Sequence, residues 1–282
     1  HQLRLRHHRA ELAVGVREGR PRTIVAGATD HYPARVARVA DEEILDVSGL
    51  AGLRQIRDAE GGWWIPAGVT WTDLVERPLP PCFDGLKRAA RAVGGVQIQN
   101  RGTIVGNVCN ASPAADGLPN LLALDAIVEL ASVRGTRRMP VASFVTGNRS
   151  TVRAADELLT GIFVPDPAVD DGTVAASTFL KLGARAYLVI SIAMVAAVLV
   201  RDAHGRITVA RVAVGACSVV AQRLAALEAE LVGHEAAPGL AGVVRSEHLA
   251  GLSPIDDVRG SAAYRLEAAE VLVRRALEEF VA

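Results

Sequence analysis

The sequence predicts an α+β fold made of two domains, and three observations lead to this prediction. The chain has 282 residues, enough for two domains with a sizeable core. Short β-branched runs alternate with helical patterns, without the Gly-x-Gly-x-x-Gly turn that would indicate a Rossmann dinucleotide fold. The stretch Pro165–Thr173 is rich in Pro, Asp and Gly, which is typical of a domain boundary. We therefore expect one domain over residues 1–172 and a second over residues 173–282.

The charge balance excludes several classes of partner. The 31 basic residues equal the 31 acidic ones, so no basic excess indicates a nucleic acid or an anionic membrane. The most apolar run, Tyr187–Val200, is 14 residues long, which is short for a membrane span. We expect this run to be a buried element and the protein to have no membrane span.

The cysteines and the N-terminus indicate a cellular compartment. Cys82, Cys109 and Cys217 lie far apart and form no Cys-x-x-Cys, so no metal site or iron–sulfur cluster is expected from this chain alone. Sparse, unpaired cysteines suit a reducing cytoplasm. The N-terminus has no apolar signal-peptide core, and because the chain begins with His1 we expect a few native residues to be missing. We expect a cytoplasmic protein.

The first domain should begin with an amphipathic helix over Leu3–Glu18, ended by Gly19. The elements that follow are predicted from β-branched runs, turn signals and helical patterns. They are strands at Thr23–Ala26 and Glu43–Val47, a hairpin of Leu53–Arg57 and Trp63–Pro66, a helix capped by Thr72, a helix at Phe83–Ala92, a strand at Ile127–Val133 and a basic turn at Gly135–Arg138.

The second domain should combine a small sheet with helices. Its predicted elements are a strand at Thr178–Arg185, a strand pair within Ile207–Cys217, helices at Ala221–Val232 and Pro238–Ala250, and a last helix through Phe280. Lys181 stands out in the first of these strands because its surroundings are apolar. A lysine stem can lie along apolar surface while its ammonium group reaches a polar opening.

The first candidate binding loop follows the strand Thr23–Ala26. That strand runs directly into Gly27–Asp30, a turn of small residues. Backbone N–H groups in such a turn can cradle a phosphate. The alternative is a plain strand–turn unit, and such turns are common. No Gly-x-Ser-x-Gly motif accompanies Asp30 and His31, so we do not interpret them as a catalytic dyad.

The second candidate loop is Arg101–Ala126, around which the rest of the chain is organised. Gly102, Gly106 and Gly117 leave room for another group to approach the backbone, and Thr103 and Asn107 place short polar side chains beside them. The loop can present several N–H groups to a phosphate without a lysine.

Asp116, at the far end of this loop, has two interpretations. Its carboxylate could hydrogen-bond the polar edge of a ring while the start of the loop holds a diphosphate. It could also simply start the helix Asn120–Ala126, since Asp is an ordinary helix-capping residue. Spacing alone favours the second interpretation.

Three segments resemble the flavoprotein subunits of molybdenum hydroxylases, the family of the carbon monoxide dehydrogenase medium subunit and the xanthine dehydrogenase flavin domain. TIVGNVCNASPAADGLPNLLALDA is similar to the family's second FAD loop, and IVAGATDH is similar to the first. Pro254–Arg265 is close to the family's C-terminal motif P-x-D-D-x-R-x-S-x-x-Y-R. Val105 and Ala28 depart from the pattern, because each stands where the family has a glycine. The resemblance covers nearly the whole chain in family order.

The resemblance implies a two-part FAD-binding domain of the vanillyl-alcohol-oxidase/PCMH type, followed by a small α+β domain of the carbon monoxide dehydrogenase flavoprotein type. It implies that Asp116 binds the pyrimidine edge of the flavin and that Leu159 and Lys181 line the ring. For Leu159, core packing is the alternative that the sequence alone favours. The residues that would hold the diphosphate are Val25, Ala26, Gly27, Ala28, Thr29 and Asp30 in the first loop, with Thr103, Gly106 and Asn107 in the second.

The function implied by the resemblance is electron transfer. Such a flavin subunit receives electrons from iron–sulfur clusters on a small partner subunit and passes them through FAD to NAD or another acceptor, while a large partner subunit carries the molybdopterin. It contributes no catalytic side chain, because the redox chemistry belongs to FAD.

Two alternatives remain open. One is a stand-alone FAD oxidoreductase, against which stands the lack of any acid–base constellation near the loops. The other is a non-catalytic assembly subunit with a degenerate flavin site, supported by Val105 and Ala28.

Overall fold

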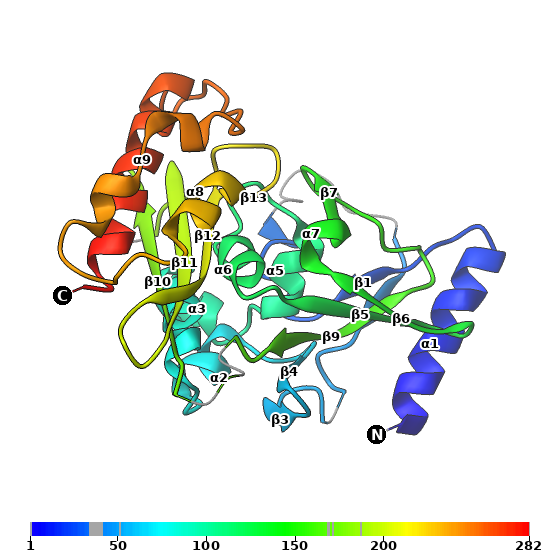
Figure 1. The fold of residues 1–282 in the computed structure, drawn as a ribbon. Coiled ribbons are helices and arrows are strands. Elements are labelled where there is room, and N and C mark those ends of the chain that lie inside the picture. Colours follow the sequence, from blue (N-terminus) through cyan, green and yellow to red (C-terminus); the bar gives the residue numbers. More distant parts are fainter. Residues whose placement is uncertain are drawn as a thin grey trace.

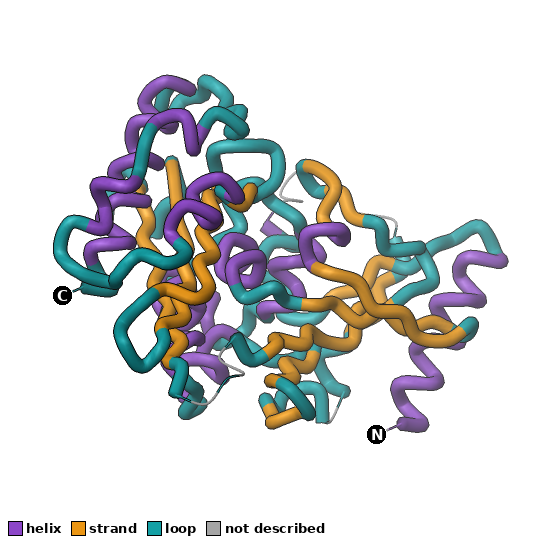
Figure 2. The backbone as a smooth tube through the Cα atoms, in the orientation of Figure 1, coloured by secondary structure: helices purple, strands orange, loops and turns teal. Residues whose placement is uncertain are grey.

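A computed structural model describes residues 2–33, 42–50, 52–167, 170, 172–186 and 188–281. Figure 1 shows two sheets side by side, with α1 at one end of the molecule and α9 at the other. Figure 2 shows that helices and loops lie between and around the strands. The described helices are α1 (Gln2–Arg17), α2 (Trp71–Glu76), η2 (Pro81–Phe83), α3 (Asp84–Ala92), α4 (Val96–Gln99), α5 (Ile104–Asn110), α6 (Gly117–Ala123), α7 (Val141–Phe144), α8 (Ala225–Leu231), η3 (Leu240–Val243), η4 (Ser246–Leu249) and α9 (Ala262–Glu278).

The N-terminal half is built on a five-stranded antiparallel sheet with the order β3-β4-β9-β5-β6. β9 lies at its centre and is buried along most of its length. A separate parallel pair, β1 with β2, precedes this sheet, and a short pair, β7 with β8, follows β6. The strands are β1 (Thr23–Val25), β2 (Ile44–Asp46), β3 (Arg57–Ala59), β4 (Gly62–Pro66), β5 (Ile127–Ser132), β6 (Gly135–Pro140), β7 (Val145–Gly147), β8 (Ser150–Thr151) and β9 (Leu158–Pro165).

The C-terminal half is a four-stranded antiparallel sheet with the order β10-β11-β12-β13. Its strands are β10 (Val174–Leu182), β11 (Ala193–Arg201), β12 (Ile207–Gly215) and β13 (Gln222–Arg223). The side chains of β11 point alternately to the two faces of the sheet, and those on both faces are buried. Met194 and Val198 join the core shared with the N-terminal half, whereas Val195 and Leu199 join the core under α8 and α9. This sheet therefore links the two hydrophobic cores.

The apolar run Tyr187–Val200 is confirmed as a buried element over its strand, although Tyr187 itself lies outside the described residues. In the described part of the chain, no helix is long and apolar enough to cross a membrane. The expected boundary segment Pro165–Thr173 is described only in part, since residues 168, 169 and 171 lie outside the description. Its described residues separate β9 from β10.

Several predicted elements need correction. Gly135–Arg138 is part of β6 and not a turn, because an edge strand can be polar throughout when its side chains face solvent. Thr70, not Thr72, caps α2: its hydroxyl accepts from the N–H of Asp73, and the Asp73 carboxylate accepts from the N–H of Thr70. In the C-terminal half, Ile207–Cys217 holds one strand, Ala221–Val232 begins with β13, and Pro238–Ala250 holds two short 3-10 helices. Three further elements have other bounds than predicted, namely β3 (Arg57–Ala59, not Leu53–Arg57), β10 (Val174–Leu182, not Thr178–Arg185) and α6 (Gly117–Ala123, not Asn120–Ala126).

The last helix forms where its sequence motif predicts. The Ser261 hydroxyl accepts from the N–H of Tyr264 and caps α9. The buried residues of α9 recur at helical spacing and face the C-terminal sheet. Arg265 is the exception in this apolar face, because it is charged and yet buried.

Candidate flavin site

The two predicted loops lie directly against each other. A Cβ atom on Gly27 would overlap the carbonyl oxygen of Arg101 and would lie 2.9 Å from the Cα of Gly102. A Cβ on Gly102 would in turn lie 3.2 Å from the hydroxyl oxygen of Thr29. Glycine is therefore required at position 27 so that the backbones can approach. The structure brings together the two segments that the sequence predicts as one binding site, although they lie far apart in the chain.

The first loop begins where β1 ends at the buried residue Val25. Ala28 has a φ of 55°, in the left-handed region that favours glycine. This is the position at which the sequence departs from the family's glycine. An alanine thus stands in a conformation that glycine adopts with less strain.

Arg149 joins the first loop to the second, and sequence reasoning assigned it no role. Its Nη1 lies 2.7 Å from Oδ2 of Asp30 and also hydrogen-bonds Oδ1 of Asn110, at the end of α5. The N–H of Arg149 donates to the carbonyl of Ala111 at 2.8 Å. The segment Phe144–Thr160, which contains this arginine, resembles a family motif, and that was the available signal.

The start of the second loop is helical, which corrects the prediction of an irregular backbone-rich loop. Thr103 caps α5, and its hydroxyl accepts from the N–H of Gly106 at 2.9 Å. Residues Ile104–Asn107 form the first turn of the helix, and three of its N–H groups already donate hydrogen bonds: Ile104 to the carbonyl of Val69, Gly106 to the hydroxyl of Thr103 and Asn107 to the carbonyl of Thr103. An anionic group at this end of α5 would be favoured by the positive end of the helix.

Asn107 and Val105 play different parts in α5. The side-chain oxygen of Asn107 accepts from the N–H of Gly117 at 3.2 Å, which holds the two ends of the loop together. A Cβ on Gly117 would lie 2.8 Å from that oxygen, so glycine suits this close approach. Val105 is 5% exposed and belongs to the hydrophobic core. Its β-branched side chain therefore fills the core behind the helix.

Asp116 is buried and is bound through its side chain by two residues of the C-terminal half. Lys181 Nζ lies 2.8 Å from Oδ2, and Ser191 Oγ donates to Oδ1 at 2.9 Å. Asp116 precedes α6, but its side chain makes no capping hydrogen bond there. The interpretation of Asp116 as an ordinary helix cap is thus not supported by the geometry. Ser191 was missed by sequence reasoning, since nothing local marks a serine 75 residues away.

Burial and the lysine act on the carboxyl of Asp116 in opposite directions. Removal from water raises the pKa of Asp116, and the positive charge and hydrogen bond of Lys181 lower it, with the pKa remaining above its ordinary value. The Lys181 side chain is 13% exposed and that of Asp116 is 9% exposed. This is a buried polar pair at the seam between the two halves.

Leu159 lies in β9 opposite Leu130 and is 2% exposed. It belongs to the core of the N-terminal half, in agreement with the core-packing alternative. The structure thus brings together the two loops, and it brings Asp116 to Lys181. It places Leu159 among core side chains.

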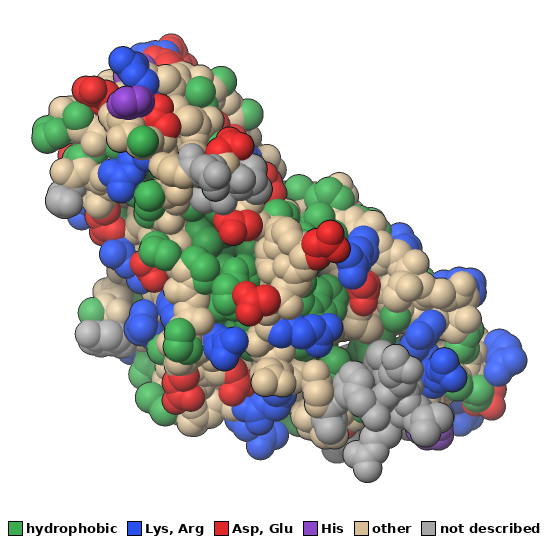
Figure 3. All heavy atoms as spheres, turned by 60° about the horizontal axis from the view of Figure 1, so that its bottom comes forward, with side chains coloured by type: hydrophobic (Ala, Val, Ile, Leu, Met, Phe, Trp, Pro, Cys, Tyr) green, Lys and Arg blue, Asp and Glu red, His purple; other side chains and the backbone are tan. Residues whose placement is uncertain are grey.

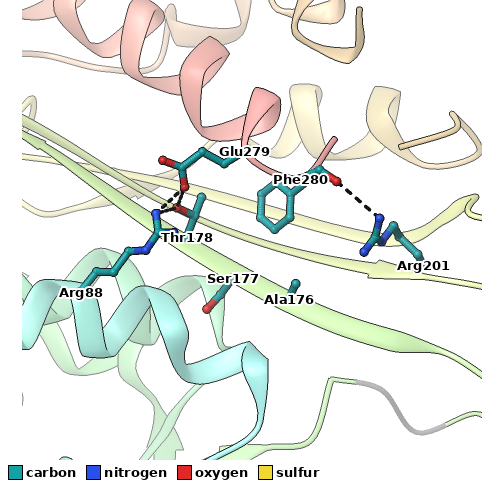
Figure 4. Close-up of a pocket in the computed structure, with 7 residues that line it drawn as sticks. All are labelled: Arg88, Ala176, Ser177, Thr178, Arg201, Glu279 and Phe280. Atoms are coloured by element: carbon teal, nitrogen blue, oxygen red, sulfur yellow. Dashed lines mark hydrogen bonds and ion pairs between the residues drawn. The ribbon is translucent and has the colours of Figure 1, made fainter. Parts of the chain in front are cut away.

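The cavity drawn in Figure 4 lies apart from these residues, between β10 and α9. It has a volume of about 210 Å³, and Arg88, Thr178 and Glu279 form a hydrogen-bonded cluster on one side of it. None of the predicted cofactor-binding residues lines it. A second cavity, of about 350 Å³, is lined by Ile190 and Ile192, which flank Ser191.

The His, Cys, Asp and Glu side chains of the described residues lie too far apart for a metal site. Among the described residues, no group of three His, Cys, Asp or Glu side chains could hold a metal ion. Cys82, Cys109 and Cys217 are free, and burial raises the pKa of each thiol, to about 12, 11 and 11 in turn. These thiols are protonated and inert at neutral pH.

Known proteins resemble this chain over both of its halves. Residues 7–167 match the family described as the FAD binding domain in molybdopterin dehydrogenase. Residues 178–280 match the CO dehydrogenase flavoprotein C-terminal domain. The nicotine 6-hydroxylase medium subunit of Paenarthrobacter nicotinovorans is 31% identical over 260 residues, which cover 91% of this chain and 88% of that protein.

A second relative and a solved structure extend the comparison. The nicotinate dehydrogenase FAD-subunit of Eubacterium barkeri is 36% identical over 181 residues, which cover 61% of this chain and 58% of that protein. A chain of the carbon monoxide dehydrogenase from Hydrogenophaga pseudoflava that lacks the Mo-pyranopterin moiety superposes with a TM-score of 0.85. It is 27% identical, and the match covers 98% of this chain and 95% of that one. The α+β fold and the family resemblance are confirmed, and the chain belongs to the family of FAD-binding medium subunits of molybdenum hydroxylases, of the carbon monoxide dehydrogenase and xanthine dehydrogenase type.

Proposed function

We propose that this flavin subunit accepts electrons from iron–sulfur clusters of a small partner subunit and passes them through FAD to NAD or another acceptor. The observation that carries the proposal is the direct contact between the two loops, at Gly27 and Arg101–Gly102. The match to the FAD-binding family supports the same reading. Bound FAD would supply the redox chemistry, and the chain would bind and orient it.

The residues at the two loops fit a diphosphate. Gly27 and Thr29 of the first segment lie against Arg101 and Gly102, directly before α5, so small residues and the N-terminal end of a helix meet there. A negatively charged group there would lie near the positive end of a helix. We assign the diphosphate of FAD to these two segments.

The buried pair Asp116 and Lys181 fits a polar ring edge. A carboxylate accepts hydrogen bonds, and an ammonium group donates them, so together they match a heterocycle that presents both donors and acceptors. We assign the pyrimidine edge of the flavin to Asp116 and a position along the ring to Lys181 and Leu159. For Leu159 this assignment rests on family resemblance, since its side chain is packed in the core.

We further propose a large molybdopterin-binding subunit and a small iron–sulfur subunit as partners. Support comes from large apolar side chains on the surface, among them Leu188, Ile190 and Ile255, each more than half exposed. Hydrophobic side chains also gather in the hollow of the face drawn in Figure 3.

Three separate free cysteines support a reducing cytoplasm as the location of the protein.

We place the division between the FAD-binding domain, residues 1–172, and the C-terminal domain, residues 173–282, in the segment that joins β9 to β10. The family matches end at residue 167 and resume at residue 178, which supports a division in this interval. The two domains would share the seam that Asp116 and Lys181 cross.

The alternative of a degenerate flavin site loses its main support in the structure. Val105 packs into the core, so it need not obstruct the loop. Ala28 adopts the left-handed conformation that favours glycine, so the alanine does not prevent this turn from forming. A stand-alone oxidoreductase is favoured by no specific observation among the described residues.

The proposal is tested by the visible spectrum of the purified chain and of the chain incubated with added FAD. We expect a flavin spectrum and release of FAD, identified by chromatography, after denaturation. FMN, which lacks the diphosphate bridge and the adenylate, is the matched control and should bind far more weakly. A colourless protein that takes up no FAD would refute the proposal. Equal binding of FMN would refute the assignment of the two loops to the diphosphate.

A further inference from the structure

A buried arginine of the last helix binds two segments that contact the candidate flavin site. Arg265 is 3% exposed, and its Nη1 donates to the carbonyl of Ile192 at 2.6 Å and to that of Ala216 at 3.2 Å. Nη2 lies 2.7 Å from Oδ1 of Asp257, while Nε has no hydrogen-bond partner in the described part of the chain. The guanidinium therefore ties three separate segments of the C-terminal half together.

Two of these segments lead directly to the second loop. The N–H of Ala216 donates to the carbonyl of Pro113 at 3.1 Å, within the loop between α5 and α6. Ser191, next to Ile192 in the chain, donates to the Asp116 carboxylate at 2.9 Å. Arg265 thus binds Ala216, which contacts Pro113, and Ile192, whose neighbour Ser191 contacts Asp116. The third contact of the C-terminal half with this loop, from Lys181 to Asp116, does not involve Arg265.

The backbone conformation of Ala216 indicates that the surrounding structure holds its contact with Pro113 in place. Ala216 has a φ of 62°, which is unfavourable for a residue with a Cβ. Such a conformation persists where the surroundings hold it in place. Arg265 binds the carbonyl of this residue, and Pro113 binds its N–H, so both of its backbone polar groups are held.

The contacts that Arg265 makes require an arginine side chain. Its planar guanidinium can donate to two carbonyls and to a carboxylate at the same time, in fixed directions. A lysine ammonium has fewer donors and no planar geometry. Asp257 offsets the buried charge, and hydrogen bonds from the N–H of Arg259 and from Arg265 lower the pKa of Asp257 to about 2.

We propose that Arg265 is a positioning residue for the flavin site: it holds the segments at Ile192 and Ala216 so that Ser191 and the loop at Pro113 fix the Asp116 carboxylate. The inference rests on the proposed function for its ligand, FAD. Arg265 itself touches neither Asp116 nor the two loops that we assign to the diphosphate.

The test compares Arg265→Met and Arg265→Lys with Arg274→Met. Arg274 is the matched control, because it lies on the same helix and also binds two carbonyls, of Ala241 at 2.9 Å and Val244 at 2.5 Å. Those carbonyls belong to η3 and the residue after it, away from the second loop. Both Met variants should lower the melting temperature, and the loss should be larger for Arg265, whose side chain is 4% exposed against 36% for Arg274. The melting temperature of each variant is therefore measured beside the two readouts.

Two readouts separate positioning from stability. Arg265→Met should weaken FAD binding by about tenfold or more, since a displaced contact residue costs much of the binding geometry. It should also speed amide hydrogen exchange in residues 113–117 of the FAD-free protein, and Arg265→Lys should recover part of both effects. Arg274→Met should leave both readouts as in the wild type.

The experiment distinguishes a failure of the inference about Arg265 from a failure of the proposed function. Equal FAD affinity and equal exchange in Arg265→Met and Arg274→Met would overturn the inference and leave the proposed function standing. If Arg265→Met does not fold, Arg265→Lys decides: wild-type affinity and exchange in that variant overturn the inference. Failure of the wild-type chain to bind FAD would refute the proposed function, and with it the role of Arg265 in FAD binding.

Discussion

Lys181 Nζ lies 2.8 Å from Asp116 Oδ2, and this ion pair joins β10 of the C-terminal half to the residue that precedes α6. The two residues are 65 positions apart in the chain. The pair is almost fully removed from water, and Ser191 completes the set of donors to the carboxylate. The seam between the two halves is therefore defined by a polar contact in the site that we assign to the flavin ring.

Replacing Lys181 by Met should destabilise the protein at neutral pH. The change leaves the Asp116 carboxylate buried without its cation, which typically costs about 3 kcal/mol. The loss should be smaller at pH 5 than at pH 7, because the pKa of Asp116 is already raised and would rise further, so the folded protein would take up a proton there. Urea unfolding at the two pH values measures the effect.

The control for this prediction is the double variant Lys181→Met/Asp116→Asn. A neutral amide in place of the carboxylate removes the unpaired charge, so most of the lost stability should return. A double variant as unstable as Lys181→Met alone would show that the lysine acts through packing and not through its charge.

Replacing Gly27 by Ala should separate the two loops. The new Cβ would overlap the carbonyl oxygen of Arg101, a backbone atom that cannot rotate away. We expect a loss of about 1–3 kcal/mol, as for other overpacked sites, together with loss of FAD binding. Gly49→Ala is the control, since a Cβ there meets no atom within 4 Å. Full FAD binding by the Gly27→Ala variant would contradict the two-loop site.

Replacing Ala28 by Gly should stabilise the protein. Alanine at a φ of 55° is strained, and glycine removes this strain, with an expected gain of about 1 kcal/mol. The midpoint of urea unfolding should rise while its slope stays the same. Ala26→Gly is the control, because Ala26 is not among the residues with positive φ, and that variant should lose stability. A lower midpoint for Ala28→Gly would show that its Cβ makes contacts that outweigh the strain.

The elements that could be predicted are those with a strong local signal. α1 follows from helical periodicity and the glycine at its end, α9 follows from the family motif that precedes it, and the β3–β4 hairpin follows from the glycines at its turn. β6 could not be predicted, because its run of exposed arginines matches a turn as well as an edge strand. Pairing with β5 decides the outcome, and a sequence window does not contain that information.

The same limit applies to the candidate site. Local composition and family resemblance pointed to Gly27, Asp116 and Lys181 one at a time. The contact of Gly27 with Arg101 and the contact of Asp116 with Lys181 are both tertiary, so Ser191 and Arg149 were assigned no role although both bind predicted site residues. Asp116 shows why this matters: spacing favoured a helix cap, whereas tertiary contacts give its carboxylate other partners.

Replacing Arg149 by Ala should weaken FAD binding with little effect on stability. Its side chain and that of Asp30 are each 54% exposed, so the ion pair should contribute less than about 1 kcal/mol. The first loop would nevertheless lose its tie to Asn110 and α5, and the diphosphate site would be less ordered. Fluorescence titration with FAD and thermal unfolding measure the two effects.

Arg245→Ala is the matched control for Arg149→Ala. Arg245 is similarly exposed and pairs with Glu230 in the C-terminal half. This variant should keep wild-type affinity for FAD. If both variants lower the affinity equally, or if Arg149→Ala leaves it unchanged, the bridging role of Arg149 is wrong.

The Asp257 carboxylate should make the protein sensitive to acid in a defined window. The N–H of Arg259 is the largest cause, and together with the Arg265 guanidinium it lowers the pKa of Asp257 to about 2, below the value of about 3.9 for an unfolded chain. A carboxyl whose pKa is lowered by folding stabilises the folded state above the unfolded pKa. This contribution should be lost as the pH falls from about 4 to about 2.

Urea unfolding across that range measures the free energy of unfolding, which should decline less steeply with falling pH in Asp257→Asn than in the wild type. Asp58→Asn, at an exposed site on β3, should keep the wild-type slope. Identical slopes for wild type and Asp257→Asn would contradict this prediction and show that other groups cause the acid sensitivity.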